Sequence, residues 1–308
     1  MVNRLRLIMS KKLEWPLESV KQDDDLNRWF HAESNLCLDF HGDPIRANLT
    51  VFSDGNHHMA LEACLKVFCE NEDGLEDIFY ATTPPAVISS ILKKGHIVLG
   101  NLTLSKLPDV FISPPDIMDK LVGDGWIDSH KKFIKSNGNV LLVRKENPKC
   151  IQNIEDLLRE DIRLFISNPV TEKASHEVYK KTLLRFATKY SINTLFETLE
   201  KNIVYGERIH HREAPQCLYD DRADVAIVYY HLALRYMRIF PDVFDIIYLE
   251  GTQHNFELTK EKVCTDYHIG LLNNNNNTGG RIWAEKFLNY MFSVEATSVY
   301  IDHGLQRP

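Results

Sequence analysis

The stretch ADVAIVYY at residues 223–230 decides the fold that the sequence predicts. An acidic turn leads into a short apolar run, which is typical of a buried strand, and a helix-like segment follows. The stretch LPDVFIS at residues 107–113 repeats this arrangement far upstream and ends on a small polar residue. In open α/β sheets, ligands bind at the carboxyl ends of parallel strands. Two such strand ends, one in each half of the chain, predict a protein of two lobes that closes on a small ligand.

Units of strand, turn and helix recur outward from these two segments. Short apolar runs predict further strands at 47–52, 78–81, 109–113, 140–144, 162–167, 203–205 and 267–272. Helical spacing of apolar residues predicts helices at 59–68, 87–94, 115–121, 154–158, 175–189, 213–219, 232–238 and 282–292. This alternation implies parallel sheets with helices on their faces, and therefore an α/β fold.

The composition is that of a globular protein, and its length suffices for two α/β domains or one large one. The chain has 308 residues, of which 44% are hydrophobic and 26% are charged. Its net charge of −7 gives no overall attraction to nucleic acid or to an anionic membrane. No apolar run approaches the roughly 18 residues of a membrane span. We therefore expect neither nucleic-acid binding nor membrane insertion.

The sequence carries few signals of compartment or of catalysis. Residues 1–12 are basic but lack the apolar core of a secretory signal, which predicts a cytoplasmic protein if the chain is complete and a periplasmic or extracellular one if a leader has been removed. The six cysteines show no C-x-x-C spacing and are expected to be structural thiols. G-x-S-x-G, Walker and H-E-x-x-H motifs are missing, so we expect a binding protein without a cofactor.

Several segments, in order, carry a resemblance to a known family. They are VFSDGN at 51–56 with ALE at 60–62, PDVFIS at 108–113, NVLLVRK at 139–145 with NP at 147–148, NP at 168–169 with AS at 174–175, HR at 211–212 leading to AIVY at 226–229, and the terminal run 284–291, SVEA at 293–296 and HGL at 303–305. Together they resemble type II periplasmic binding proteins, particularly the branch that binds molybdate and tungstate.

This resemblance implies a two-lobed fold, each lobe being a mostly parallel sheet flanked by helices. Residues 1–46 would be an N-terminal extension, 47–139 with 267–308 would form lobe I, and 140–266 would form lobe II. The implied function is that of the solute-binding proteins of ABC transporters. These proteins hold a small oxyanion in the cleft between the lobes, without chemical change, and an ABC permease is then a candidate partner.

Neutral donors at helix starts and strand ends are the candidates for holding such an anion. Backbone N–H groups at helix N-termini, hydroxyls and amides suit a tetrahedral oxyanion. The residues so placed are Asn56, Thr83, Ala174 through its backbone N–H, Ser175, His211, Arg212 and Tyr229. Four of them also have a purely structural interpretation: Asn56 as a turn former, Thr83 as a helix cap, Tyr229 as a packing residue, and Arg212 as the partner of Asp220 or Glu213.

Two pairs of adjacent histidines leave an alternative open. His57 with His58, and His210 with His211, lie on segments that would face one another across the cleft. Imidazoles are good ligands for transition metals, so the chain could instead bind or sense a metal. Protonated histidines could also favour an anion at mildly acidic pH. An enzyme built on the same fold is a third possibility, which turnover of the ligand would reveal.

Overall fold

The computed structural model describes residues 39–82, 85–99, 102–192, 195–207, 209–249, 262–273 and 278–308. The chain separates into two compact units. The described residues of the larger unit lie within 39–139, 229–235 and 262–308, and those of the smaller unit within 140–228 and 236–249. The lobe limits expected from the sequence stay a prediction.

The larger unit is built on a seven-stranded sheet with the order β1-β3-β2-β6-β13-β7-β14. Strand β2 runs parallel to β3 and β6, whereas β13 runs antiparallel to β6 and β7. The parallel pairing expected from the sequence therefore holds for β3, β2 and β6, and antiparallel strands extend the sheet on both sides: β1 pairs with β3 at one edge, and β13 and β7 follow β6 toward the other. The strands are β1 (Asp39–His41), β2 (Leu49–Ser53), β3 (Ile78–Thr82), β6 (Val110–Ser113), β7 (Ile127–Ser136), β13 (Asp266–Leu272) and β14 (Leu305–Gln306).

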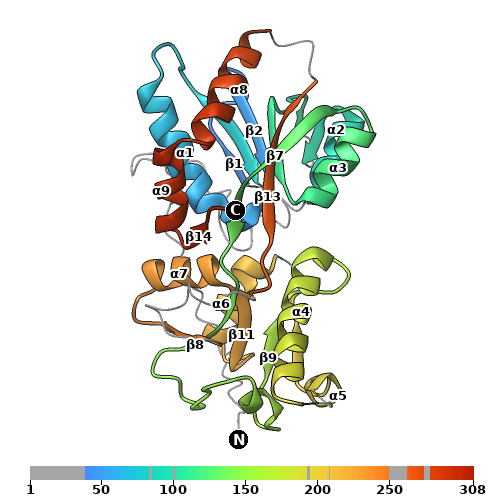
Figure 1. Ribbon diagram of the computed structural model, residues 1–308, viewed down its shortest axis with the longest axis vertical. Helices are drawn as coiled ribbons and strands as arrows, with labels where there is room; N and C mark the ends of the chain where they lie inside the picture. Colours follow the sequence, from blue (N-terminus) through green and yellow to red (C-terminus); the bar gives the residue numbers. More distant parts are fainter. Residues whose placement is uncertain are drawn as a thin grey trace, which may run out of the picture. The chain divides into compact units, whose positions relative to one another are not determined.

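Helices cover both faces of this sheet because its central strands are apolar on both sides. Helices α1 (His58–Asn71), α8 (Thr278–Met291) and α9 (Val294–Asp302) cover one face, and α2 (Pro85–Lys94) and α3 (Pro115–Gly123) cover the other (Figure 1). Alternate residues of β2 separate the two cores: Leu49 and Val51 face the first set of helices, and Phe52 faces the second. A short ribbon of β4 (Ile97–Leu99) and β5 (Leu102–Leu104) follows α2.

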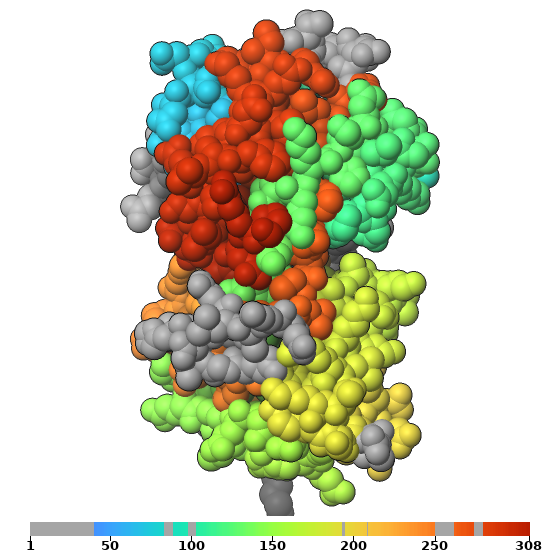
Figure 2. Space-filling view, viewed as in Figure 1, coloured from blue at the N-terminus to red at the C-terminus, as the bar shows by residue number. Residues whose placement is uncertain are grey.

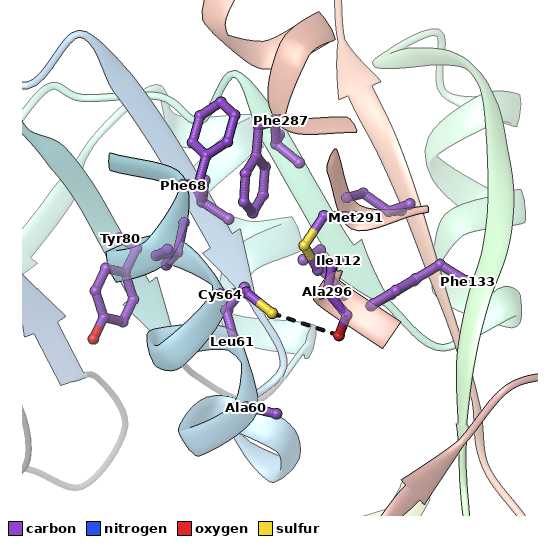
Figure 3. Close-up of a cluster of buried hydrophobic side chains, with 14 of the residues drawn as sticks. Ala60, Leu61, Cys64, Phe68, Tyr80, Ile112, Phe133, Phe287, Met291 and Ala296 are labelled. Atoms are coloured by element: carbon purple, nitrogen blue, oxygen red, sulfur yellow. Dashed lines mark hydrogen bonds between the residues drawn. The ribbon is translucent and has the colours of Figure 1, made fainter. Parts of the chain in front are cut away.

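The core beneath α1, α8 and α9 brings together residues from the N-terminal and C-terminal segments of the larger unit. Phe68 of α1 packs against Phe287 of α8 with ring centroids 5.2 Å apart (Figure 3). The thiol of Cys64 lies 3.8 Å from the carbonyl oxygen of Ala296 at the start of α9. Burial raises the pKa of this thiol to about 12, so it stays protonated. Figure 2 shows α8 and α9, in orange to red, at the outer surface of the unit.

The smaller unit is built on a five-stranded sheet with the order β10-β9-β11-β8-β12. Strand β9 pairs in parallel with β10 and with β11, and β12 closes the other edge antiparallel to β8. The strands are β8 (Asn139–Arg144), β9 (Leu164–Ile166), β10 (Ile203–Tyr205), β11 (Val225–Tyr229) and β12 (Phe244–Ile247). The helical elements are η3 (Glu155–Leu158), α4 (Lys173–Lys189), α5 (Leu195–Leu199), α6 (His210–Tyr219) and the end of α7 (Tyr230–Ile239), whose residues 230–235 belong to the larger unit.

Two sheets flanked by helices confirm the α/β fold that the sequence predicts. The opening stretch, residues 223–230, contains β11, and all five residues of that strand are buried. None of the helices within the described ranges is long and apolar enough to span a membrane.

An ion pair fixes the turn before β11 to the residue before β9. The Arg163 guanidinium donates to both carboxylate oxygens of Asp224, at 2.9 and 3.0 Å, and the Arg163 backbone N–H donates to the same carboxylate at 2.8 Å. Burial by itself would raise the pKa of Asp224, but these hydrogen bonds from Arg163 outweigh it and hold the pKa below its ordinary value of 3.8.

The Asp224→Asn variant is expected to lose stability at pH 7, by about 1–3 kcal/mol, because the charged hydrogen bonds are lost. A carboxyl whose pKa is lower in the folded state stabilises the fold above its unfolded pKa, and this contribution disappears as the pH falls through the folded value. The difference between variant and wild type should therefore shrink below about pH 4. Urea unfolding at pH 7 and pH 3 measures this, with Asp242→Asn as the exposed control. An equal loss of unfolding free energy at both pH values would contradict the lowered pKa of Asp224.

Candidate functional site

The candidate site residues of the larger unit follow the carboxyl end of β2. Asp54 caps the 3-10 turn η2 (Gly55–His57), because its side chain accepts a hydrogen bond of 2.7 Å from the Asn56 backbone N–H. The N–H of Asp54 itself donates to the carbonyl of Ile112 at 3.0 Å. The backbone donor of Asn56 is thus engaged within the protein, so Asn56 would contact a ligand through its half-buried side-chain amide.

The His57 ring is held by two hydroxyl groups. Its Nε2 lies 3.1 Å from Ser53 Oγ and its Nδ1 lies 3.1 Å from the Tyr300 hydroxyl. Burial, aided by the neighbouring His231 and His58, lowers its pKa to about 3. The expectation that a protonated histidine favours an anion at mildly acidic pH is therefore wrong for His57, because burial disfavours its charged form.

The histidine pairs do not assemble a recognisable metal centre within the described residues. His58 Nδ1 lies 2.9 Å from the Gly55 carbonyl oxygen, and His210 Nδ1 lies 2.7 Å from Glu172 Oε1. Across the described ranges, no group of three or more His, Cys, Asp or Glu side chains is placed to hold a metal ion. The metal alternative built on His57, His58, His210 and His211 gains no support from this geometry.

The turn after β3 is only partly visible. Thr82 ends that strand and is buried. Thr83, which the sequence proposes as a ligand donor, lies outside the described residues.

In the smaller unit, the turn between β9 and α4 presents a set of backbone donors. The Asn168 side chain accepts from the N–H groups of Val170 and Thr171 at 2.8 and 3.2 Å, which shapes the turn. Helix α4 then begins at Lys173. Its first three N–H groups, at residues 173–175, have no acceptor among the hydrogen bonds of the described chain, as the geometry of a helix start dictates. Ala174 and Ser175, both predicted site residues, supply two of these three donors.

The Ser175 hydroxyl adds a side-chain group at the same place. It is buried and donates to the Glu172 carbonyl at 3.0 Å, which leaves its oxygen lone pairs directed away from that bond. The Ala174 side chain is exposed. The start of α4 is therefore accessible and rich in donors.

The start of α6 differs, because a carboxylate of the protein already caps it. Glu172 accepts from the His210 backbone N–H at 2.8 Å and lies 2.7 Å from the ring Nδ1 of the same residue. The next N–H groups, of Arg212 and Glu213, donate to the Ile209 carbonyl at 3.1 and 3.0 Å. His211, the predicted donor at this helix start, is buried, and its carbonyl accepts from the Tyr236 hydroxyl at 2.6 Å.

The remaining predicted site residues, Arg212 and Tyr229, are both buried. Arg212 is buried in the first turn of α6. Of the two carboxylates predicted as its partners, Asp220 lies 3.7 Å from Arg222, and Glu213 accepts from the Glu207 N–H at 2.8 Å. Tyr229 ends β11, is buried, and places its hydroxyl 3.2 Å from Thr265 Oγ1.

Some polar groups at strand ends are not among the predicted site residues, although the sequence places Ser113 at such a position. Ser113 ends β6 and Ser167 follows β9, and both side chains are buried without a hydrogen-bond partner in the described part of the chain. The hydroxyl of Tyr267, on β13, is in the same situation, and its ring lies 4.7 Å from the His57 ring. Buried hydroxyls of this kind indicate contact with water or a ligand. Their position at a strand's carboxyl end was the signal that could have identified the two serines.

Comparisons with known proteins place these features in context. The model of a family described as bacterial extracellular solute-binding protein matches residues 49–306. No curated protein matches the sequence significantly.

Several solved structures share the fold. The sulfate-binding protein SubI from Mycobacterium tuberculosis is 17% identical, with a TM-score of 0.63 over 84% of this chain and 86% of that one. A periplasmic molybdate-binding protein from Azotobacter vinelandii is 16% identical, with a TM-score of 0.58 over 84% and 99%. Peb3 from Campylobacter jejuni is 17% identical, with a TM-score of 0.58 over 84% and 100%. At these identities the likeness concerns the fold.

Proposed function

Since the chain belongs to the bacterial extracellular solute-binding proteins, we propose that it binds a small inorganic oxyanion of the molybdate, tungstate or sulfate class for an ABC permease. Proteins of this family bind their solute without changing it chemically, so we expect binding and no turnover. The fold shared with a molybdate-binding and a sulfate-binding protein makes these anions the first to test.

The observation that carries this proposal is the start of α4. A 17-residue helix begins there with three N–H groups that no described protein acceptor occupies, beside the Ser175 hydroxyl. The partial positive charge at a helix N-terminus and its outward N–H groups favour an anion. The net charge of −7 does not oppose this, because local dipoles act at contact distance while the net charge is screened by salt.

The acidic residue at this helix start does not cancel the attraction. Glu172 immediately precedes α4, but its carboxylate turns toward α6, where the backbone and ring of His210 engage both of its oxygens. Its charge is therefore compensated by a charge-assisted hydrogen bond and by the dipole of α6.

A thermal-shift screen tests the proposed ligand class directly. At a ligand concentration about 100 times the dissociation constant, binding adds roughly 2.7 kcal/mol to the free energy of unfolding. We expect a clear rise in melting temperature with molybdate, tungstate or sulfate, and none with sodium chloride at matched ionic strength. Phosphate and phospholactate belong in the same screen, because PEB3 has a solved structure with L-phospholactate bound. No rise with any of these anions would overturn the proposal.

A further inference from the structure

Two histidines on neighbouring strands of the larger unit face each other. His130 lies on β7 and His268 on β13, which pair antiparallel. Their Nδ1 atoms are 2.7 Å apart, and the ring centroids are 4.9 Å apart. The other ring nitrogen of His130, Nε2, lies 2.9 Å from the carboxylate of Asp119 on α3.

The carboxylate determines where the protons lie in this chain of contacts. An ionised carboxylate only accepts hydrogen bonds, so His130 must carry its proton on Nε2 and, when neutral, present a lone pair at Nδ1. The 2.7 Å contact then requires His268 to donate from its own Nδ1. One proton thus lies between two nitrogen atoms that are both capable of metal coordination.

We propose that His130 and His268 form a binding site for a divalent transition-metal ion, Cu²⁺, Ni²⁺ or Zn²⁺, which takes the place of that shared proton. Imidazole nitrogens are preferred ligands of these ions. With metal–nitrogen bonds of about 2.0–2.1 Å in a tetrahedral arrangement, the two Nδ1 atoms would lie about 3.3 Å apart, so the rings separate by only a fraction of an ångström. The displaced proton moves to Nε2 of His268, which stays neutral.

Asp119 is positioned to orient His130, the proposed metal ligand, through a hydrogen bond. Metal-bound histidines commonly donate their other N–H to a carboxylate, which fixes the ring and strengthens its lone pair. The Asp119 side chain is 72% exposed and the His130 side chain 13% exposed, so an ion can reach the pair from solvent and keep water in its remaining positions. Lys132 lies opposite His268, and its charge is balanced by Asp266 at 2.9 Å.

This site differs from the histidine pairs that the sequence suggests for metal binding. Those are adjacent in sequence, and the buried ring of His57 lies between two hydroxyl groups. His130 and His268 are 138 positions apart and are brought together by the pairing of β7 with β13. Because only two imidazoles and water would coordinate the ion, we expect weaker metal binding than in a closed site of four protein ligands.

Titration calorimetry of the full chain with copper, nickel and zinc chloride tests the proposal at pH 7.5, where free histidine is mostly neutral. His268→Gln and His130→Gln should each weaken binding by at least about tenfold, and Asp119→Asn by about tenfold because only the ring orientation is lost. His96→Gln, in the same unit but outside the pair, should bind as the wild type does.

A spectroscopic measurement on the unaltered protein completes the test. Electron paramagnetic resonance with one equivalent of Cu²⁺ should show coupling to two nitrogen nuclei. Wild-type affinity in all three variants, or a copper signal with oxygen ligands alone, would overturn the proposal. If a glutamine variant does not fold, the exposed Asp119→Asn variant and the copper spectrum still decide the outcome.

Discussion

Replacing Ala174 with proline is expected to weaken oxyanion binding by about ten- to a hundredfold while leaving α4 folded. Proline removes one N–H donor, and a hydrogen bond to a charged group contributes about 1.5–3 kcal/mol. Helix α4 should tolerate the change, because the lost N–H lies in the first turn and makes no bond within the helix.

The matched control is Ala174→Gly, which keeps the backbone N–H and removes only an exposed methyl group. We expect it to bind the anion as the wild type does. Calorimetry with the anion that gives the largest thermal shift compares the two variants. Equal affinities for the proline and glycine variants would remove the Ala174 N–H from the site.

Replacing Phe287 with alanine is expected to lower the free energy of unfolding by about 3–5 kcal/mol, the usual cost of deleting a buried phenylalanine. Phe287 is fully buried and lies within the core between α1, α8 and the sheet (Figure 3). Its ring packs against the rings of Phe68 and Tyr290, with centroid distances of 5.2 Å and 6.3 Å. The cavity would therefore open where α8 packs on α1, helices that are more than 200 positions apart in sequence.

Ile282→Ala on the same helix is the control, since that side chain is 61% exposed and should change stability little. Urea unfolding followed by circular dichroism compares the two variants with the wild type. A loss for Phe287→Ala no larger than that for Ile282→Ala would show that α8 contributes little to the stability of the larger unit.

Local pattern predicted the buried elements well because burial leaves a direct mark on the sequence. The apolar runs at 109–113 and 223–230 are β6 and β11, and the helix expected at 59–68 is α1. Strand β7 was not predicted, because its sequence IDSHKKFIKS is mostly polar and its pairing with β13 is what makes it a strand. The directions of β13 and β7 likewise depend on contacts between distant segments, which local periodicity does not contain.

The placement of the candidate residues at turns and helix starts was predictable from the sequence, but their hydrogen bonding was not. Asn56, Ala174, Ser175 and His211 do lie at turn or helix starts, as the strand–turn–helix pattern requires. The sequence did not show that Asp54 and Glu172 would occupy nearby N–H groups. Nor did it show that Tyr300, 243 positions away, would hold His57 in a buried and uncharged state. Each of these depends on a tertiary contact.

The place of β13 in the seven-stranded sheet has a consequence for synthesis on the ribosome. The strand lies between β6 and β7, although it is made more than 120 residues after either of them. Until it emerges, β6 and β7 each expose a strand edge, and the core beneath α8 and α9 is half built. The strands of the smaller sheet, all within 139–247, are complete before that point. The smaller sheet can therefore assemble first, while the edges of β6 and β7 in the larger sheet stay unpaired until the C-terminal segment has been made.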